Sequence, residues 1–415
     1  MGREQNWAGS YTYGARVIHR PATIEQLREI VAGAPRIRVL GSRHTFSDIA
    51  DSDELVSLER LPPVIEVADG QVTVGGAVRY GDLAPVLDEH RLALHNLASL
   101  PHTTIAGAVA TATHGSGDGN GNHATAVAAI ELVTSAGEIV AARRGDPDFD
   151  ALVVNLGALG AVTRVTLDAE PFYEIRQRVF EDLGWDTLYE DFDAITGAGY
   201  SVSVFTLWRE TSSVWVKSRG EPPQELRGAT PAPEDRHPIP GIDPVNCTAQ
   251  LGVAGPWWDR LPHFRMGFTP SAGEELQSEY QVPRAHAIEA IQAVRALAPA
   301  LQPVLQVSEI RTIAADRLWL SPQHASDTIG IHFTWTREPE SVARALARVE
   351  ATLEPFDARP HWGKLFLAKA TAMGGLYERL PDFAGLAERL DPRGAFRNQW
   401  LEERVLGRRA DSAPA

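Results

Sequence analysis

Apolar positions in the first 170 residues follow helix and strand periods in turn. A Thr23–Gln26 capping pattern precedes apolar residues at helical spacing and predicts a helix over residues 24–32. The alternating stretch 37–40 predicts a strand, and the apolar face of residues 80–89 predicts a second helix. The opening of the chain is therefore expected to mix α and β elements.

Hairpin signals dominate the rest of this part of the chain. The stretch "VIEVADGQVTVGGAV" joins two alternating runs at Asp69-Gly70, and "AAIELVTSAGEIVAAR" turns at Ala136-Gly137. A further strand is expected after the glycines of "VNLGALGAVTRVTLDAEP". Residues 1–170 are thus predicted to form one α+β domain, without the regular helix–strand repeat of a doubly wound nucleotide fold.

The pattern changes after Glu170-Pro171. Long alternating runs predict a mostly antiparallel sheet: "YSVSVFTLW", "SVWVKSR", "VLQVSEIRTIAA" and "TIGIHFTWTRE". A proline-rich insertion interrupts them, and helices are expected at residues 284–297 and 339–353. The predicted organisation is a second α+β domain over residues 171–390 and a C-terminal segment, 391–415, that docks back on the first domain.

Composition excludes several classes of function. The formal charge of 39 − 54 = −15 disfavours non-specific binding of nucleic acid or anionic membranes. One cysteine, Cys247, excludes an intrachain disulfide and a cysteine-rich metal site. We expect a cytoplasmic protein, although a secreted protein without disulfides is also compatible. The chain shows no run of 18 apolar residues and no obvious apolar edge, so no membrane span and a monomer are expected.

Two glycine-containing segments carry candidate chemistry. "RIRVLGSRHTFSDIA" places His44 in a turn after a strand, and "LPHTTIAGAVATATHGSGDGNGNHA" is rich in glycines and hydroxyls. Such chains bring backbone N–H groups close to a ligand, which favours a diphosphate bound between them. The alternative is a pair of flexible loops. Neither segment matches a G-x-G-x-x-G or Walker fingerprint.

These segments, with "LGALGAVTRVTL", resemble the FAD-binding domain of the vanillyl-alcohol-oxidase family. The later stretches "ELQSEY", "EIRTIAADRLWLSP", "HFTW" and "HWGKLF" extend the resemblance to the alditol oxidases, also called xylitol oxidases, over essentially the whole chain. The resemblance implies a two-subdomain FAD-binding domain followed by an α+β substrate domain with a large antiparallel sheet.

The resemblance also implies FAD bonded covalently to His44 through the 8α carbon of the flavin. A neutral imidazole held by a rigid turn is a competent nucleophile there, whereas a lone loop histidine would more simply cap the strand or contact phosphate. Arg43 departs from the small residue common in relatives and could pair with the pyrophosphate or crowd it. The implied cofactor-binding residues are Gly41, Ser42, Arg43, His44, Thr45, Ser47, Thr104, Gly107, Thr111, Thr113, His114, Gly115, Gly157, Gly160 and Val162.

Spacing in the second half predicts a polar site. Glu309 and Arg311 are two apart in an expected strand and share a face, as do His332 and Thr334. Gln277 and Lys364 are assigned to comparable alternating stretches. Mixed donors and acceptors suit a polyol, while a solvated charged strand face is the alternative. The resemblance implies the substrate-binding set Thr104, Gln277, Glu309, Arg311, His332, Thr334 and Lys364, with Arg311, Lys364, Glu309 and His332 catalytic.

The implied reaction is oxidation of the terminal primary hydroxyl of an alditol to the aldose, with dioxygen reduced to hydrogen peroxide. A small polyol and dioxygen are the expected partners, and no metal is required. His102, His114 and His123 lack ligand spacing to any carboxylate and are predicted to line loops or the flavin. Two alternatives stay open: an aldonolactone oxidase or dehydrogenase of the same superfamily, and a non-catalytic flavin-binding protein.

Overall fold

The computed structural model describes residues 4–267 and 275–408. The N-terminal part begins with a parallel sheet beside helix α1 (Ile24–Gly33). The Thr23 hydroxyl caps this helix by accepting a hydrogen bond from the Gln26 N–H at 3.2 Å, as the capping pattern predicts. In sheet order the strands are β1 (Val17–His19), β3 (Glu54–Val56) and β2 (Ile37–Val39).

A second, antiparallel sheet completes the N-terminal part and contains both predicted hairpins. Asp69 and Gly70 have φ of 51° and 73°, the left-handed geometry that a two-residue hairpin turn requires. Alternate residues of β5 and β9 are buried, as the alternating pattern predicts. In sheet order the strands are β4 (Ile65–Ala68), β5 (Gln71–Gly75), β9 (Ala161–Asp168), β7 (Val127–Val133) and β8 (Ile139–Arg143).

The C-terminal part is built on a nine-stranded antiparallel sheet, as predicted. The long strand β11 was not predicted, because its polar residues hide the alternation of buried positions. The path runs β14 (Thr230–Pro231), β11 (Glu174–Gly184), β13 (Thr211–Ser218), β12 (Ser201–Thr206), β17 (Leu305–Ile313), β18 (Thr328–Trp335), β16 (Leu276–Pro283) and β19 (Arg359–Pro360), and β15 (Gly255–Pro256) pairs with β11.

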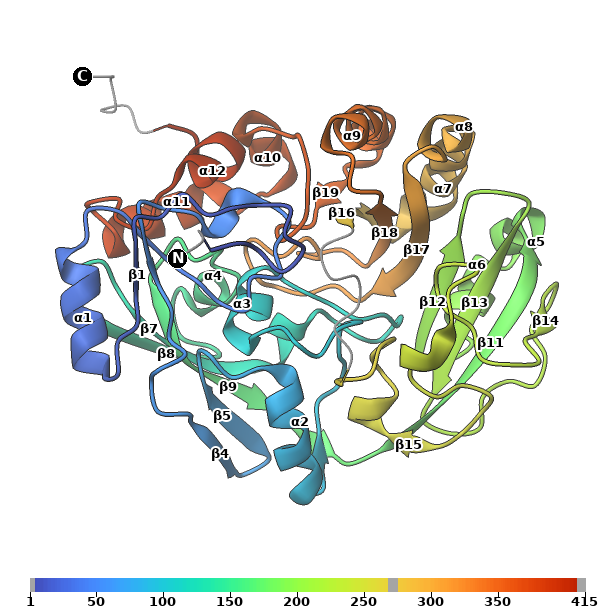
Figure 1. The fold of residues 1–415 in the computed structure, drawn as a ribbon, viewed down its shortest axis with the longest axis horizontal. Coiled ribbons are helices and arrows are strands. Elements are labelled where there is room, and N and C mark those ends of the chain that lie inside the picture. Colours follow the sequence, from blue (N-terminus) through green and yellow to red (C-terminus); the bar gives the residue numbers. More distant parts are fainter. Residues whose placement is uncertain (1–3, 268–274, 409–415) are drawn as a thin grey trace.

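Helices pack with their apolar faces against the sheets. Helices α2 and α9 occupy the ranges predicted from sequence, and α7, α8 and α9 lie beside β16 to β18 (Figure 1). The α-helices after α1 are α2 (Tyr80–Glu89), α3 (Ile105–Ala110), α4 (Phe149–Val153), α5 (Trp185–Glu190), α6 (Phe192–Thr196), α7 (Ala287–Ala296), α8 (Ala298–Leu301), α9 (Pro339–Leu353), α10 (Ala370–Leu376), α11 (Leu380–Leu390) and α12 (Gln399–Leu401). No helix in the described part of the chain has the length and apolarity to cross a bilayer.

The end of the described chain packs against its beginning, with red α12 beside the blue N-terminal segment in Figure 1. Arg38 organises this junction: its buried guanidinium donates to the backbone carbonyls of Ile49, Leu156, Gly157 and Phe396 at 2.6–3.0 Å. One core cluster spans both halves, and β10 (Glu170–Pro171) pairs with β6 (Leu92–Ala93) at the predicted boundary. The domain limits therefore stay a prediction.

Candidate active site

One cavity runs between the two halves and is lined by residues of both. Ser47 and Gly115 lie outside its lining: the Ser47 hydroxyl is buried nearby, and Gly115 packs against Asn96 and Leu97. The predicted cofactor residues that do line it are Gly41, Ser42, Arg43, His44, Thr45, Thr104, Gly107, Thr111, Thr113, His114, Gly157, Gly160 and Val162.

The two glycine-containing segments meet at Thr104, which lies beside Gly41, Ser42 and Gly107. A Cβ at Gly41 would lie 2.8 Å from the Thr104 hydroxyl, and a Cβ at Gly107 would lie 2.9 Å from it, so a larger residue at either position would displace the Thr104 side chain. The Thr104 N–H donates to the Ser42 hydroxyl at 3.0 Å. Gly41 and Gly107 leave backbone of this wall accessible to the cavity beside the hydroxyl side chains that line it, which suits a large, flat, phosphorylated ligand.

Arg43 has φ 63° in the turn after β2, an unusual conformation for a side chain of its size. Its Nε lies 2.7 Å from the Glu4 carboxylate, and another guanidinium nitrogen donates to the Gly41 carbonyl. In this arrangement Arg43 is paired with a carboxylate of the same chain. This contact does not test whether Arg43 pairs with a pyrophosphate or crowds it, so both remain predictions.

His44 has the properties of an available nucleophile. Its Nδ1 lies 2.8 Å from the Ser42 carbonyl and must carry the proton, while its buried Nε2 has no hydrogen-bond partner among the described residues. Trp7 stacks on the ring with centroids 5.2 Å apart. Burial lowers the pKa of His44 to about 4, so the imidazole is neutral. The glycine-lined wall and this unpartnered nitrogen together fit a bound flavin.

The opposite wall carries the polar residues of the second half. Glu309 and Arg311 on β17 and His332 and Thr334 on β18 all face the cavity, which confirms the predicted shared faces. Gln277 joins them from β16. The surrounding positions of β17 and β18 are buried as well, so this is no solvated strand face.

Lys364 reaches this group from a different kind of segment. It lies in the turn after β19, where its N–H donates to the His361 carbonyl at 3.0 Å, so its assignment to an alternating strand was wrong. The neighbouring Gly363 accepts from the Phe46 N–H at 2.9 Å. Tertiary contacts with the His44 turn therefore set the position of Lys364.

Glu279 is the central charge of the site, and sequence reasoning missed it. The carboxylate is fully buried and accepts from Arg311 at 2.8 Å and from Lys364 at 2.7 Å. Burial would raise the pKa of Glu279, but the charges of Arg311 and Lys364 hold it well below its ordinary value. The signal was available, because Glu279 is two residues from Gln277 in "ELQSEY" and shares its strand face.

The buried charges of the cluster are paired. Glu279 and Glu309 carry two negative charges against the positive charges of Arg311 and Lys364. Lys364 donates to His332 Nδ1 at 2.7 Å, so the other ring nitrogen of His332 carries the proton and donates to Thr334 at 3.1 Å. Burial and the charge of Lys364 lower the pKa of His332 to about 4. Buried charges that are paired, together with mixed donors and acceptors, favour a neutral ligand with several hydroxyls.

The histidine predictions need one correction. His114 Nε2 lies 3.1 Å from Glu279, and atoms of His114, Glu279 and His361 lie within 4.8 Å of one another, so ligand spacing to a carboxylate does exist. These residues are far apart in sequence, where spacing cannot show them. Arg311 and Lys364 already bind the same carboxylate, and the expectation that no metal is required stays a prediction. His102 instead contacts the Met266 carbonyl, and His123 packs on Tyr80.

Comparisons with known proteins agree with this geometry. Residues 15–143 match the family described as FAD binding domain, and residues 273–404 match the one described as D-arabinono-1,4-lactone oxidase. A crystal structure of cholesterol oxidase from B. sterolicum shares the fold at a TM-score of 0.75 and 15% identity, covering 96% of this chain and 95% of that one. Fold and site define an FAD-dependent oxidoreductase with a vanillyl-alcohol-oxidase type of FAD-binding domain.

Sequence relatives narrow the class. Alditol oxidase from Streptomyces sp. (strain IKD472 / FERM P-14339) is 48% identical over 413 residues, which cover 97% of this chain and 99% of the relative. The L-gulono-1,4-lactone dehydrogenase of Mycobacterium tuberculosis (strain ATCC 25618 / H37Rv) is 29% identical, covering 97% and 98%. The chain belongs to the alditol oxidase family.

Proposed function

We propose that this protein oxidises the terminal primary hydroxyl of alditols such as xylitol and sorbitol to the aldose, with dioxygen reduced to hydrogen peroxide. The observation that supports it most is the buried set of paired charges, donors and acceptors across the cavity from the glycine-lined wall. Bound FAD would accept the hydride and pass the electrons to dioxygen. The relative with 48% identity is itself an alditol oxidase.

Roles for the polar residues follow from their chemistry. Arg311 and Lys364 hold the reacting hydroxyl and stabilise its alkoxide-like form as hydride leaves. Burial lowers the pKa of Lys364, which makes a neutral amine accessible as general base. The other hydroxyls of the alditol bind to Gln277, Glu309, His332 and Thr334. Thr104 contacts the substrate from the cofactor side.

The competing substrate class is the aldonolactones, because more distant relatives are lactone oxidases and dehydrogenases at 25–29% identity. Peroxide formation in air should be measured with xylitol and with L-gulono-1,4-lactone at matched concentrations. We expect peroxide with xylitol at a kcat/KM at least about tenfold that of the lactone, a preference of about 1.4 kcal/mol. If only the lactone gives peroxide, the lactone and not the alditol is the substrate.

We further propose that FAD is attached covalently through His44, since its imidazole is neutral, buried and has an unpartnered nitrogen on the cavity wall. The His44→Ala protein should release all its flavin into the supernatant on acid precipitation, whereas the unaltered protein should keep its yellow flavin in the pellet. His102→Ala is the control. It removes a histidine next to the cavity residues Thr103 and Thr104 and should keep the flavin bound. Flavin retained in the His44→Ala pellet would contradict the attachment.

Thr104 offers a test of substrate length. Thr104 lines the cavity on the cofactor side, so Thr104→Ser removes one methyl group and opens space there. We expect kcat/KM for sorbitol to rise relative to xylitol by about threefold to fivefold, the effect of about one buried methyl group. Steady-state kinetics with both alditols measure this ratio. An unchanged ratio would show that Thr104 does not limit chain length.

A further inference from the structure

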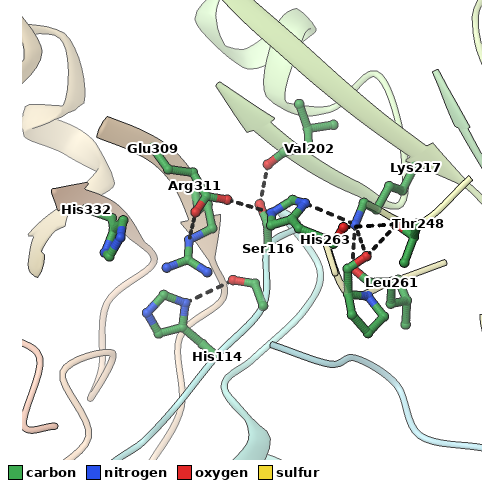
Figure 2. A network of polar contacts seen from close by, with 12 residues as sticks. His114, Ser116, Val202, Lys217, Thr248, Leu261, His263, Glu309, Arg311 and His332 are labelled. Carbon is green, nitrogen blue, oxygen red and sulfur yellow. Dashed lines mark hydrogen bonds and ion pairs between the residues drawn. The ribbon is translucent and has the colours of Figure 1, made fainter. Parts of the chain in front are cut away.

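Lys217, on β13, is a buried lysine that the proposed reaction does not use. Its side chain is 1% exposed and points away from solvent toward the 261–263 turn (Figure 2). Its ammonium donates to the carbonyls of Leu261 and Pro262 and to Nδ1 of His263, the last at 3.4 Å. All three donors of the ammonium are thus occupied by acceptors, and one of those acceptors is an imidazole.

His263 links this lysine to the active site. It lines the cavity, and its Nε2 lies 3.0 Å from the Glu309 carboxylate (Figure 2). An ammonium has only protons to offer, so Nδ1 of His263 must accept, and the ring proton of the neutral imidazole must be on Nε2. That proton is then donated to Glu309. In the other tautomer two lone pairs would face each other across the same 3.0 Å.

We propose that Lys217 is a positioning residue for substrate binding, which acts by fixing His263 in the Nε2–H tautomer and so orienting the carboxylate of Glu309 toward the hydroxyls of the substrate. The role in binding a polyol rests on the proposed function, whereas the effect of Lys217 on the His263 tautomer does not depend on which substrate binds. Burial lowers the pKa of His263 to about 4, which keeps the imidazole neutral. The charge of Arg311 and the bond from His263 oppose burial and hold the pKa of Glu309 below its ordinary value.

The surroundings of Lys217 define the conditions for a test. Burial lowers the pKa of Lys217 to about 7, opposed by the nearby Glu309 and Cys247 and assisted by Arg311. Below that pH the charged ammonium of Lys217 donates to Nδ1 of His263, which must therefore act as the acceptor. Experiments are therefore best done at about pH 6, where Lys217 is charged and His263, with a pKa of about 4, is neutral.

The direct test measures the tautomer of His263 in the holoenzyme. In protein labelled with ¹⁵N-histidine, the His263 signals are assigned by their loss in His263→Gln. We expect the proton on Nε2 at about pH 6. In Lys217→Met the excess of this tautomer should be smaller, because methionine fills the space without donating to Nδ1 and only Glu309 then favours the Nε2 proton. A proton on Nδ1, or no change in Lys217→Met, would overturn the proposal. This readout needs no substrate, so it fails or succeeds independently of the alditol assignment.

Kinetics test the consequence for binding. Lys217→Met should raise the KM for xylitol about tenfold while kcat changes less than about twofold and flavin content stays unchanged. A glutamine at position 263 can donate its amide to Glu309 without help from Lys217. In the His263→Gln background, adding Lys217→Met should therefore change KM by less than about twofold. Equal effects in both backgrounds would overturn the proposed route through His263.

Thr248→Val provides the matched control. The Thr248 hydroxyl donates to the Pro262 carbonyl at 2.8 Å, the same carbonyl that Lys217 binds, and Figure 2 shows it on the far side of the lysine from Glu309. Valine removes this bond without altering the charge beside the imidazole. We expect KM to stay within about twofold of the unaltered protein. A rise equal to that of Lys217→Met would assign the effect to packing of the turn and overturn the proposal.

Discussion

Lys364→Met should slow the oxidation of xylitol by about 10²–10⁴-fold, the range expected when a general base is removed. Burial lowers the pKa of this amine, which donates to Glu279 at 2.7 Å and to His332 Nδ1 at 2.7 Å. Methionine keeps the length and apolar stem of the side chain but can neither hold nor remove a proton. Stopped-flow reduction of the flavin by xylitol without oxygen measures this step separately from reoxidation.

The pH profile separates a base from a mere charge. Because a lowered pKa makes the neutral amine available earlier, kcat/KM of the unaltered protein should rise with pH through a value below the ordinary lysine pKa of about 10.4. That rising limb should be absent in Lys364→Met. Lys369→Met is the control, since Lys369 is exposed and pairs with Glu403 at 2.8 Å. An unchanged profile in Lys364→Met would remove Lys364 from the role of base.

Glu279→Gln should destabilise the fold by about 3–5 kcal/mol, because it removes one partner from a buried ion-pair cluster. Glutamine has nearly the same shape, but it leaves the charges of Arg311 and Lys364 without their shared carboxylate. Denaturant unfolding of the holoenzyme, followed by tryptophan fluorescence, measures the change. Glu350→Gln is the control, because that carboxylate accepts from a tyrosine hydroxyl and backbone N–H groups rather than from a cation, and burial raises its pKa.

The destabilisation by Glu279→Gln should depend on pH. Glu279 raises the pKa of Lys364 against the lowering effect of burial, so its removal lowers that folded-state pKa further. A base with a lowered folded-state pKa binds fewer protons when folded, so stability rises with pH between that pKa and the unfolded value of about 10.4. Glu279 itself stabilises the fold only where it is ionised, so the loss in Glu279→Gln is largest above the unfolded glutamate pKa of about 4.3 and shrinks as pH rises toward the lysine pKa. A loss independent of pH would contradict this account of the cluster.

Local signals in the sequence were sufficient for the regular elements. The face of α2 and the Asp69-Gly70 hairpin depend on neighbouring residues alone, and the shared faces of β17 and β18 follow from the two-residue period of strands. Those periods placed Glu309 and Arg311 correctly on one cavity wall. Residues that the family resemblance named, including Thr104 and Lys364, line the same cavity.

Long-range contacts explain what the sequence did not reveal. Arg38 alternates with apolar neighbours like a surface residue, yet four carbonyls from three distant segments bury it. Lys364 reaches the site from a turn that is fixed by Gly363 and Phe46 rather than by strand periodicity. Glu279 has a visible strand position, but no local pattern tells a carboxylate that binds two buried cations from one that faces solvent.

An FAD-dependent oxidase of alditols in this cavity should show itself in one spectrum. The visible absorption of the purified protein should be recorded without oxygen, before and after adding xylitol. We predict a flavin band that bleaches with xylitol and returns when air is admitted. A flavin band that xylitol leaves unchanged would contradict the proposed substrate, and soluble protein without any flavin band would contradict the assignment of the His44 turn to the cofactor.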